Sequence, residues 1–351
     1  MAGAKGAAEW EIGGQAVRVT SLDRPMWAGK AAGLRDGSVV TKGDLLSYYA
    51  EVAPALLGAV GNRPTTLQRF TRGVIVADHE GESFYNKHLP KSVPDFVDSA
   101  VVTFPSGRTA HQVCPRDAAT IVWAANLGCV TFHPWPVRCD RTEEPDELRL
   151  DLDPQPGTSF GDVVEAALAL REVLESVGLE GFVKTSGGRG VHVFCAIHPQ
   201  WEFLDVRHAA IAIGRALERQ LPDLVTTAWW KEERGARIFV DYNQMARDRT
   251  MASAWSLRPL PGAPVSMPLT WADLATCTPG EFTIRTVPDL LSSQGNPWAD
   301  LGSSPGSLHT ALEWWQADIT ERGLGEMPFP PDYPKMPGEP PRVQPSKRRN
   351  P

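Results

Sequence analysis

The order of the secondary-structure elements expected in residues 148–241 constrains the fold more than any other feature of the chain. Alternating apolar residues in LRLDLD predict a strand, and TSFGDVVEAALALREVLESVG predicts a helix that ends at Gly178. The strands GFVKTS and VHVFCAI, a helix over residues 203–220 and the strand RIFVDY then follow. Strand, helix, strand, strand, helix, strand is the split βαβ arrangement of RNA-recognition-motif-like sheets. In that arrangement the first strand lies between the third and the fourth.

The whole chain is expected to be an α+β protein in which this sheet packs against an N-terminal α/β subdomain. The length of 351 residues allows two compact units, and the acidic, proline-containing loop RTEEPDE predicts a boundary near residue 140. Thr41 and Asp44 form a capping-box pattern at the start of one helix, and Asp117 is a suitable N-cap for a second. We therefore expect a flexible tail over residues 1–14 and the N-terminal subdomain over residues 15–140. The sheet subdomain should span residues 141–290, and a helix with a Pro-rich tail residues 291–351.

Composition narrows the class of protein. The net charge of −7, from 35 Lys and Arg against 42 Asp and Glu, argues against an extended basic surface but permits local basic clusters. The five cysteines include no CxxC pair, so we expect no disulfide framework and a reducing compartment. The spacing of Cys129, His133 and Cys139 fits no common zinc site, and we expect buried thiols. No signal-peptide core or membrane-spanning stretch is evident, which predicts a soluble, cytoplasmic protein with no membrane partner.

Three aspartates at strand ends are the candidate metal ligands. Asp151 and Asp153 are two apart in LRLDLD, so their side chains lie on the same face of the strand. Asp241 ends a second apolar strand, and the expected topology makes the two strands neighbours. Three converging carboxylates need cations, and oxygen ligands suit magnesium or manganese. The alternative is an exposed strand end with incidental acids; whether Asp241 lies opposite Asp151 or Asp153 is open.

The glycine-rich segment TSGGRGVH predicts a phosphate-binding loop between two strands. Gly187 and its neighbours allow close approach of backbone N–H groups to an anion, and Ser186 and Arg189 add donors. His192 opens the next strand, and Arg258 in a Pro- and Gly-rich loop is a further candidate for binding phosphate. The alternative is a simple β-hairpin turn. The segment is not a Walker A loop, because it lacks GxxxxGK and a strand follows it.

The first half of the chain contains weaker candidates. Lys42 lies in the first turn of a predicted helix, where unpaired backbone N–H groups and a lysine would form an anion pocket that Arg24 could join. Each could equally be a surface charge. Phe84 and Tyr85 in FYNKH resemble a nucleic-acid stacking platform, although packing in an aromatic core explains them equally well. On the residues alone, His133 is a structural histidine.

The motifs LRLDLDP, KTSGGRGVHVF, RIFVDYNQ and SLRPLPGAPVSMPLTWADL together resemble the polymerase domain of bacterial DNA ligase D. That family belongs to the archaeo-eukaryotic primase superfamily and serves non-homologous end joining. The resemblance extends over residues 15–290 in motif order, and the tail DYPKMPGEPPRVQPSK is typical of its members. Each motif is weak alone, but the combination is specific.

The resemblance implies roles for particular residues. By it, two ions, Mn²⁺ or Mg²⁺, are held by the catalytic residues Asp151, Asp153 and Asp241. The expected nucleotide-binding residues are Ser186, Gly187, Arg189, His192, Arg258, His133 near the sugar and Gln244 near the active site. Residues 15–140 are expected to bind the DNA end. Within them, Arg24 and Lys42 would bind the 5′-phosphate of a recessed end, and Phe84 and Tyr85 would stack against the template. Gln68 replaces a loop lysine of the family, and Arg24 replaces its more usual lysine.

The resemblance also implies a function. We expect a DNA repair polymerase/primase that extends ends and fills gaps with rNTPs or dNTPs by two-metal phosphoryl transfer. The alternatives are a primase that starts chains without a primer and a non-catalytic DNA-end-binding module. The expected partners are DNA with gaps, overhangs or double-strand breaks, nucleoside triphosphates, the end-binding protein Ku and a separate ligase. No KxDG ligase motif is present, so a stand-alone, nucleoid-associated polymerase is expected.

Overall fold

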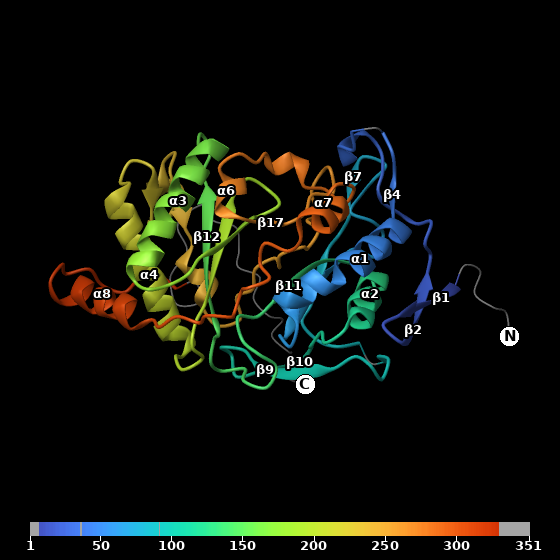
Figure 1. Cartoon of the computed structure of the whole chain (residues 1–351), viewed down its shortest axis with the longest axis horizontal. Helices are drawn as coiled ribbons and strands as arrows, with labels where there is room; N and C mark the ends of the chain where they lie inside the picture. Colours follow the sequence, from blue (N-terminus) through green and yellow to red (C-terminus); the bar gives the residue numbers. More distant parts are fainter. Residues whose placement is uncertain (1–6, 36, 91, 330–351) are drawn as a thin grey trace, which may run out of the picture.

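The structure is a computed structural model that describes residues 7–35, 37–90 and 92–329. Figure 1 shows β12 and the helices α3 and α4 on one side of the molecule, and α1 and α2 on the other. The helices are α1 Lys42–Val60, α2 Ala118–Asn126, α3 Phe160–Ser176, α4 Phe203–Gln220, α5 Lys231–Arg234, α6 Trp271–Leu274, α7 Val287–Gln294 and α8 His309–Thr320, with 3-10 turns η1 Lys30–Ala32, η2 Tyr242–Met245 and η3 Pro279–Glu281. None of the helices in this described part is long and apolar enough to cross a membrane.

A six-stranded sheet carries the predicted split βαβ unit. Its strand order is β15-β16-β12-β14-β13-β17, so the first strand of the unit, β12, lies between the third and the fourth, β14 and β16. The prediction of this order is confirmed; the edge strands β15 and β17 were not predicted. The strands are β12 Glu147–Pro154, β13 Phe182–Thr185, β14 Val191–Ala196, β15 Val225–Thr226, β16 Ile238–Val240 and β17 Pro268–Leu269.

The register of the sheet places Asp241 opposite Asp151. β12 and β16 are antiparallel with Leu152 paired to Val240, and the backbone N–H of Asp241 donates to the carbonyl of Asp151 at 2.9 Å. On the other side of β12, Asp151 pairs with His192 of β14. The leucines that alternate with the acids are fully buried, and α3 and α4 pack against this strand. Burial of one face thus fixes which face carries the acids.

The N-terminal half contains smaller sheets around α1 and α2. One has the order β11-β5-β10-β9 with β8 beside β5, another the order β4-β3-β6-β7, and β1 and β2 form a hairpin. The capping box of Thr41 and Asp44 and the N-cap Asp117 are present as predicted. The strands are β1 Ala7–Ile12, β2 Gln15–Thr20, β3 Pro25–Trp27, β4 Val40–Thr41, β5 Thr65–Arg69, β6 Ile75–Val76, β7 His79–Glu80, β8 Phe84–Asn86, β9 Ser99–Thr103, β10 Thr109–Val113 and β11 Cys129–Pro134.

The expectation of a flexible tail over residues 1–14 is wrong for residues 7–14. β1 pairs with β2 throughout, because Val17 and Val19 of β2 are buried and bring the hairpin against α2. Gly13 and Gly14 form its turn with positive φ angles of 57° and 82°, which glycine adopts without strain. Residues 1–6 and the Pro-rich segment 330–351 lie outside the described residues. The other subdomain boundaries remain predictions, and α7 runs through the one expected at residue 290.

The expectation of a buried free thiol is wrong for Cys139. Cys114 and Cys139 are bonded, with their Cα atoms 6.4 Å apart. The fold brings together the end of β10 and the loop after β11, a proximity that the spacing of the cysteines does not reveal. Cys129 is a buried free thiol, as expected, and so is Cys195.

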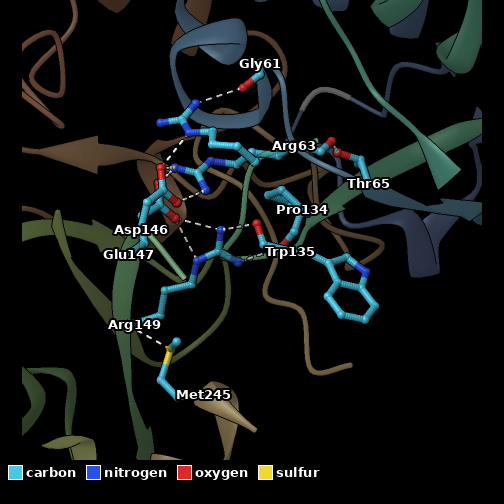
Figure 2. A network of polar contacts seen from close by, with 10 residues as sticks. Gly61, Arg63, Thr65, Pro134, Trp135, Asp146, Glu147, Arg149 and Met245 are labelled. Atoms are coloured by element: carbon cyan, nitrogen blue, oxygen red, sulfur yellow. Dashed lines mark hydrogen bonds and ion pairs between the residues drawn. The ribbon is translucent and has the colours of Figure 1, made fainter. Parts of the chain in front are cut away.

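A buried network of charged side chains joins the two halves at the start of β12 (Figure 2). Arg63, in the loop between α1 and β5, donates to Asp146 and Glu147 at 2.5 Å each. Arg149 of β12 donates to Glu147 at 2.7 Å and to the carbonyl of Pro134, at the end of β11, at 2.6 Å. Arg63, Glu147 and Arg149 are each less than 4% exposed. The network therefore sets the position of the aspartate-bearing strand relative to the strand that bears His133.

Candidate active site

Asp151 and Asp241 form the acidic centre of the site. They occupy facing positions on β12 and just after β16, and the Asp151 side chain is 21% exposed. Burial, Asp241 and Asp153 together raise the pKa of Asp151 to about 8. Burial also raises the pKa of Asp241. Two carboxylates whose charged forms repel each other in a desolvated site favour either protons or a divalent cation.

Neighbouring amides orient the acids. Asp241 accepts from the backbone N–H of Asn243 at 3.0 Å and from the Gln244 side chain at 2.9 Å. Asp153 is exposed and accepts from the Gln155 side chain at 3.3 Å. Within the described residues, no group of three or more His, Cys, Asp or Glu side chains is arranged to hold a metal ion without movement. The all-oxygen donor set nevertheless fits Mg²⁺ or Mn²⁺, which typically retain several water ligands.

His192 and Lys184 lie beside the acidic centre. His192 Nε2 is 3.4 Å from the Asp151 carboxylate, and its Nδ1 is 2.7 Å from the Lys184 amine. Lys184 is fully buried and also donates to the Ser266 hydroxyl at 2.5 Å. Burial lowers the pKa of both His192 and Lys184. Lys184 was not among the residues expected at the site. Its signal in the sequence is a lysine inside the apolar strand GFVKTS, and the strand register pairs it with His192.

The glycine-rich loop is organised by Ser186. Its hydroxyl accepts from the backbone N–H groups of Gly188 and Gly190, both at 3.1 Å. The N–H groups of Gly188 and Gly190 therefore already have an acceptor within the loop. Gly187 has a φ of +73°, and a Cβ there would lie 2.4 Å from the Arg258 side chain. Arg258 can lie against the loop only because residue 187 is glycine.

Arg258 faces Asp151 from the loop side. It donates to the Ser186 carbonyl at 2.7 Å, and its Nε is buried without a partner among the described residues. Burial lowers the pKa of Arg258, while Asp151 opposes that shift. Arg189 of the same loop is exposed and donates to the carbonyl of Pro154 at 3.3 Å. Arg189 is the basic group of the glycine-rich loop itself, and Arg258 comes from the Pro- and Gly-rich loop later in the chain.

His133 reaches the same site from β11. Burial, with the positive charges of Arg258 and Lys184, lowers its pKa to about 3, so the ring is neutral near pH 7. His133 Nε2 lies 3.4 Å from the Gln68 side chain, and the Tyr85 ring packs edge-on at 5.4 Å. Gln68 thus contacts a site residue, a role that its place in the sequence did not indicate.

Phe84 and Tyr85 are surface residues. They lie on β8 and are 41% and 53% exposed, so the alternative of an aromatic core is wrong for this stretch. The guanidinium of Arg69 lies 5.2 Å from the centre of the Phe84 ring. Of the two exposed rings, that of Tyr85 lies beside His133, and that of Phe84 lies against Arg69.

Lys42 and Arg24 lie together in the N-terminal half. Lys42 is 2% exposed, and its amine donates to the carbonyl of Thr20 at 2.6 Å and to Asn126 at 2.7 Å. Burial, and then the charge of Arg24, lower the pKa of Lys42 to about 8. The first backbone N–H groups of α1 donate to the carbonyls of residues 22 and 24 and to the Thr41 hydroxyl. The expectation of unpaired N–H groups at this helix start is therefore wrong.

Comparison with known proteins shows one consistent similarity. The model of the LigD primase-polymerase domain family matches residues 41–298. The bifunctional non-homologous end joining protein LigD of Bacillus subtilis is 32% identical over 267 residues, which are 76% of this chain and 42% of that protein. The multifunctional protein LigD of Pseudomonas aeruginosa is 29% identical over 276 residues, 78% of this chain and 32% of that protein.

A solved structure shows the same similarity in three dimensions. The polymerase domain from Mycobacterium tuberculosis Ligase D, in complex with DNA, aligns with a TM-score of 0.72 and 28% identity over 82% of this chain and 98% of that one. The chain spans less than half the length of the curated LigD proteins that it matches. The matched region contains the strands of the six-stranded sheet and the acidic centre. The chain belongs to the LigD primase-polymerase domain family, a family of nucleotidyltransferases that act on DNA.

Proposed function

We propose that this protein is a DNA repair polymerase that extends DNA ends and fills gaps with rNTPs or dNTPs during non-homologous end joining. One observation carries the proposal: Asp151 and Asp241 face each other on neighbouring strands, and Arg258, His192 and Lys184 lie directly beside them. Nucleotidyl transfer needs metal ligands and hydrogen-bond donors for a triphosphate. Here acidic side chains that suit the first role lie next to basic side chains that suit the second.

The acidic residues and the basic residues of the site would have different roles. Asp151, Asp153 and Asp241 would hold two divalent ions, Mn²⁺ or Mg²⁺, in a metal-dependent family. Such ions stabilise the attacking and leaving oxygens of an in-line phosphoryl transfer. Arg258 and His192 would bind the triphosphate, and the loop from Ser186 to Arg189 would close over it. Gln244, expected to lie near the nucleotide, acts here by orienting Asp241.

The DNA would approach from the side of β8. The solved relative is a complex with DNA. Exposed aromatic rings such as those of Phe84 and Tyr85 stack on bases without sequence preference, at about 1–3 kcal/mol per base. Near them, His133 would contact the nucleotide sugar. Arg24 and Lys42 would bind the 5′-phosphate of the strand downstream of a gap.

Nucleotide incorporation into a gapped duplex that carries a downstream 5′-phosphate tests the proposal. We expect incorporation that requires Mn²⁺ or Mg²⁺. Synthesis on a template without a primer would instead support the primase alternative. DNA binding without incorporation under any metal would leave only a DNA-end-binding module. In the cell we propose that the protein acts at the nucleoid, with the end-binding protein Ku and a separate ligase as partners; co-purification from cross-linked cells tests this.

Replacement of His192 should affect the nucleotide more than the DNA. His192→Ala is expected to raise the KM for nucleoside triphosphate about tenfold, because one charge-assisted hydrogen bond to phosphate is typically worth about 1.5–3 kcal/mol. The Kd for gapped DNA should stay within about twofold. His111→Ala, an exposed histidine on β10, is the control. A parallel loss of DNA affinity would contradict the assignment of His192 to the triphosphate.

Replacement of Lys42 tests the binding of the 5′-phosphate. Wild type should bind a gap with this phosphate about tenfold more tightly than a gap without it, and Lys42→Ala should lose that difference. The advantage should fade as pH rises through about 8, where the Lys42 amine loses its proton, and as salt rises.

Lys42→Ala should also lower the melting temperature, because the buried hydrogen bonds from the amine to the Thr20 carbonyl and to Asn126 are lost. The exposed Lys30→Ala is the matched control for charge. If Lys42→Ala lowers stability but still distinguishes the phosphate, the lysine serves only the fold.

A further inference from the structure

The third candidate metal ligand is supported by the short turn η2. Asp241 accepts a hydrogen bond from the backbone of Asn243 at 3.0 Å and one from the side chain of Gln244 at 2.9 Å. Both donors belong to η2, so the direction of the Asp241 carboxylate follows the position of that turn. Asn243 is only 3% exposed, which means that its side chain is held by protein and not by solvent.

Two elements from outside the turn hold the Asn243 amide. Arg207, on α4, donates from Nε to the Asn243 side-chain oxygen at 2.9 Å. The Asn243 side-chain nitrogen donates to the carbonyl of Pro328 at 3.1 Å. Pro328 belongs to the segment that follows α8, and we refer to residues 326–329 as the C-terminal strap. The strap therefore touches the turn that orients Asp241, although it lies some 85 residues later in the chain.

Arg207 joins the strap to the turn. Besides Asn243, its guanidinium donates to the Glu326 carboxylate at 2.6 Å and to the carbonyls of Met327 at 2.8 Å and Pro328 at 3.2 Å. It also lies within 5.5 Å of the ring centres of Tyr242, in the turn, and Phe329, in the strap. A side chain 3% exposed and bonded in this way holds two segments in a defined relative position.

A second buried arginine on the same helix serves as a comparison for Arg207, because it contacts the C-terminal region but not the turn. Arg215 lies on the same helix, two turns later, and is also buried. It donates to the carbonyl of Gly325 at 2.7 Å, pairs with Asp318 at 3.4 Å and lies over Trp315. Arg215 thus fastens the same C-terminal region to α4. Its hydrogen bonds within the described residues go to that region and none goes to η2.

We propose that Arg207 and Asn243 are positioning residues for Asp241, and that the C-terminal strap is a structural part of the metal site. The proposal rests on the proposed role of Asp241 as a metal ligand. Residues that support metal ligands through hydrogen bonds fix the orientation of those ligands, and their replacement typically costs 10- to 100-fold in metal affinity. Arg207 joins α4 and the strap to the turn, so loss of its contacts, or of those of the Asn243 side chain, should weaken metal binding without removing a ligand.

The test measures Mn²⁺ binding directly. Free Mn²⁺ is titrated into the metal-free full chain, without DNA or nucleotide, and its electron paramagnetic resonance signal reports the unbound ion. We expect Arg207→Met and Asn243→Ala to raise the Kd for Mn²⁺ by about 10- to 100-fold. Nucleotide incorporation should need correspondingly more Mn²⁺ and should recover when Mn²⁺ is saturating. Arg215→Met should lower the melting temperature and leave the Mn²⁺ Kd unchanged.

Each outcome decides the matter. If Arg207→Met and Asn243→Ala bind Mn²⁺ as wild type does, while Asp241→Ala loses binding, the positioning proposal is wrong. An equal loss in Arg215→Met would trace the effect to general loosening and would also overturn it. If Asp241→Ala itself binds Mn²⁺ normally, the metal assignment fails, and the proposal fails with it. Asn243→Ala leaves Arg207 and the strap intact, so it remains a valid test if Arg207→Met does not fold.

Discussion

Asp151→Ala and Asp241→Ala should each abolish nucleotide addition at any concentration of Mn²⁺. The two carboxylates face each other across neighbouring strands, so removal of either would leave the proposed ions without one side of their site. Metal ions contribute several kcal/mol to stabilisation of the transition state, and about 4 kcal/mol corresponds to a rate loss of roughly a thousandfold. Single-turnover incorporation into a gapped duplex measures the loss. Asp300→Ala, which removes an exposed acid, is the control and should retain full activity.

Removal of the charge at Asp151 should not weaken the metal-free fold. A carboxyl group whose pKa is raised in the folded state stabilises the protein below its unfolded pKa of about 4 and loses that contribution as pH rises. For Asp151, with a folded pKa of about 8, the loss extends from about pH 4 to about pH 8. Asp151→Asn has no carboxyl group to ionise, so its free energy of unfolding at pH 8 should exceed that of wild type. Calorimetry with a chelator present would contradict this if the variant melted lower.

Glu147→Ala should have the largest effect on stability. Glu147 is the shared acceptor of Arg63 and Arg149, all three buried, and its removal leaves two guanidinium groups with too few acceptors. Removal of one partner from a buried ion pair typically costs about 3–5 kcal/mol. Urea unfolding measures the change in the free energy of unfolding.

An exposed acid close to Glu147 in sequence supplies the control. Glu144 pairs with Arg141 at 3.6 Å on the surface, and Glu144→Ala should change stability by less than about 1 kcal/mol. If Arg149→Met added to Glu147→Ala restored none of the lost stability, unpaired charge would not be the cause.

Much of the catalytic sheet could be predicted because its sequence obeys a strong local pattern. The alternation of leucine with acid in LRLDLD identifies the strand, its buried face and the two same-face acids before any tertiary contact is known. The short connections around GGRG then leave one arrangement of the four core strands. The register between β12 and β16 could not be read from sequence, because both strands are apolar and the segment between them is long. The backbone bond from Asp241 to Asp151 resolves it.

The features that sequence missed depend on contacts between distant segments. Lys184 looks out of place in an apolar strand until Ser266 and His192 are seen to surround its amine. Cys114 and Cys139 carry no spacing motif, and only the fold brings them together. The first strand of the hairpin was missed because AAEWEI is short and has only two large apolar residues, Trp10 and Ile12. Its turn residues Gly13 and Gly14 were the available signal.

The backbone hydrogen bond between Asp241 and Asp151 makes the spacing of the acids a property of the sheet itself. Adjacent strands lie about 4.8 Å apart wherever they pair, so side-chain substitutions elsewhere cannot widen the gap between these two positions. Insertion or deletion of one residue in β16 would shift the strand by one position and turn Asp241 to the opposite face. The position of Asp241 should therefore tolerate changes of length in distant helices and loops, but no change in the length of this three-residue strand.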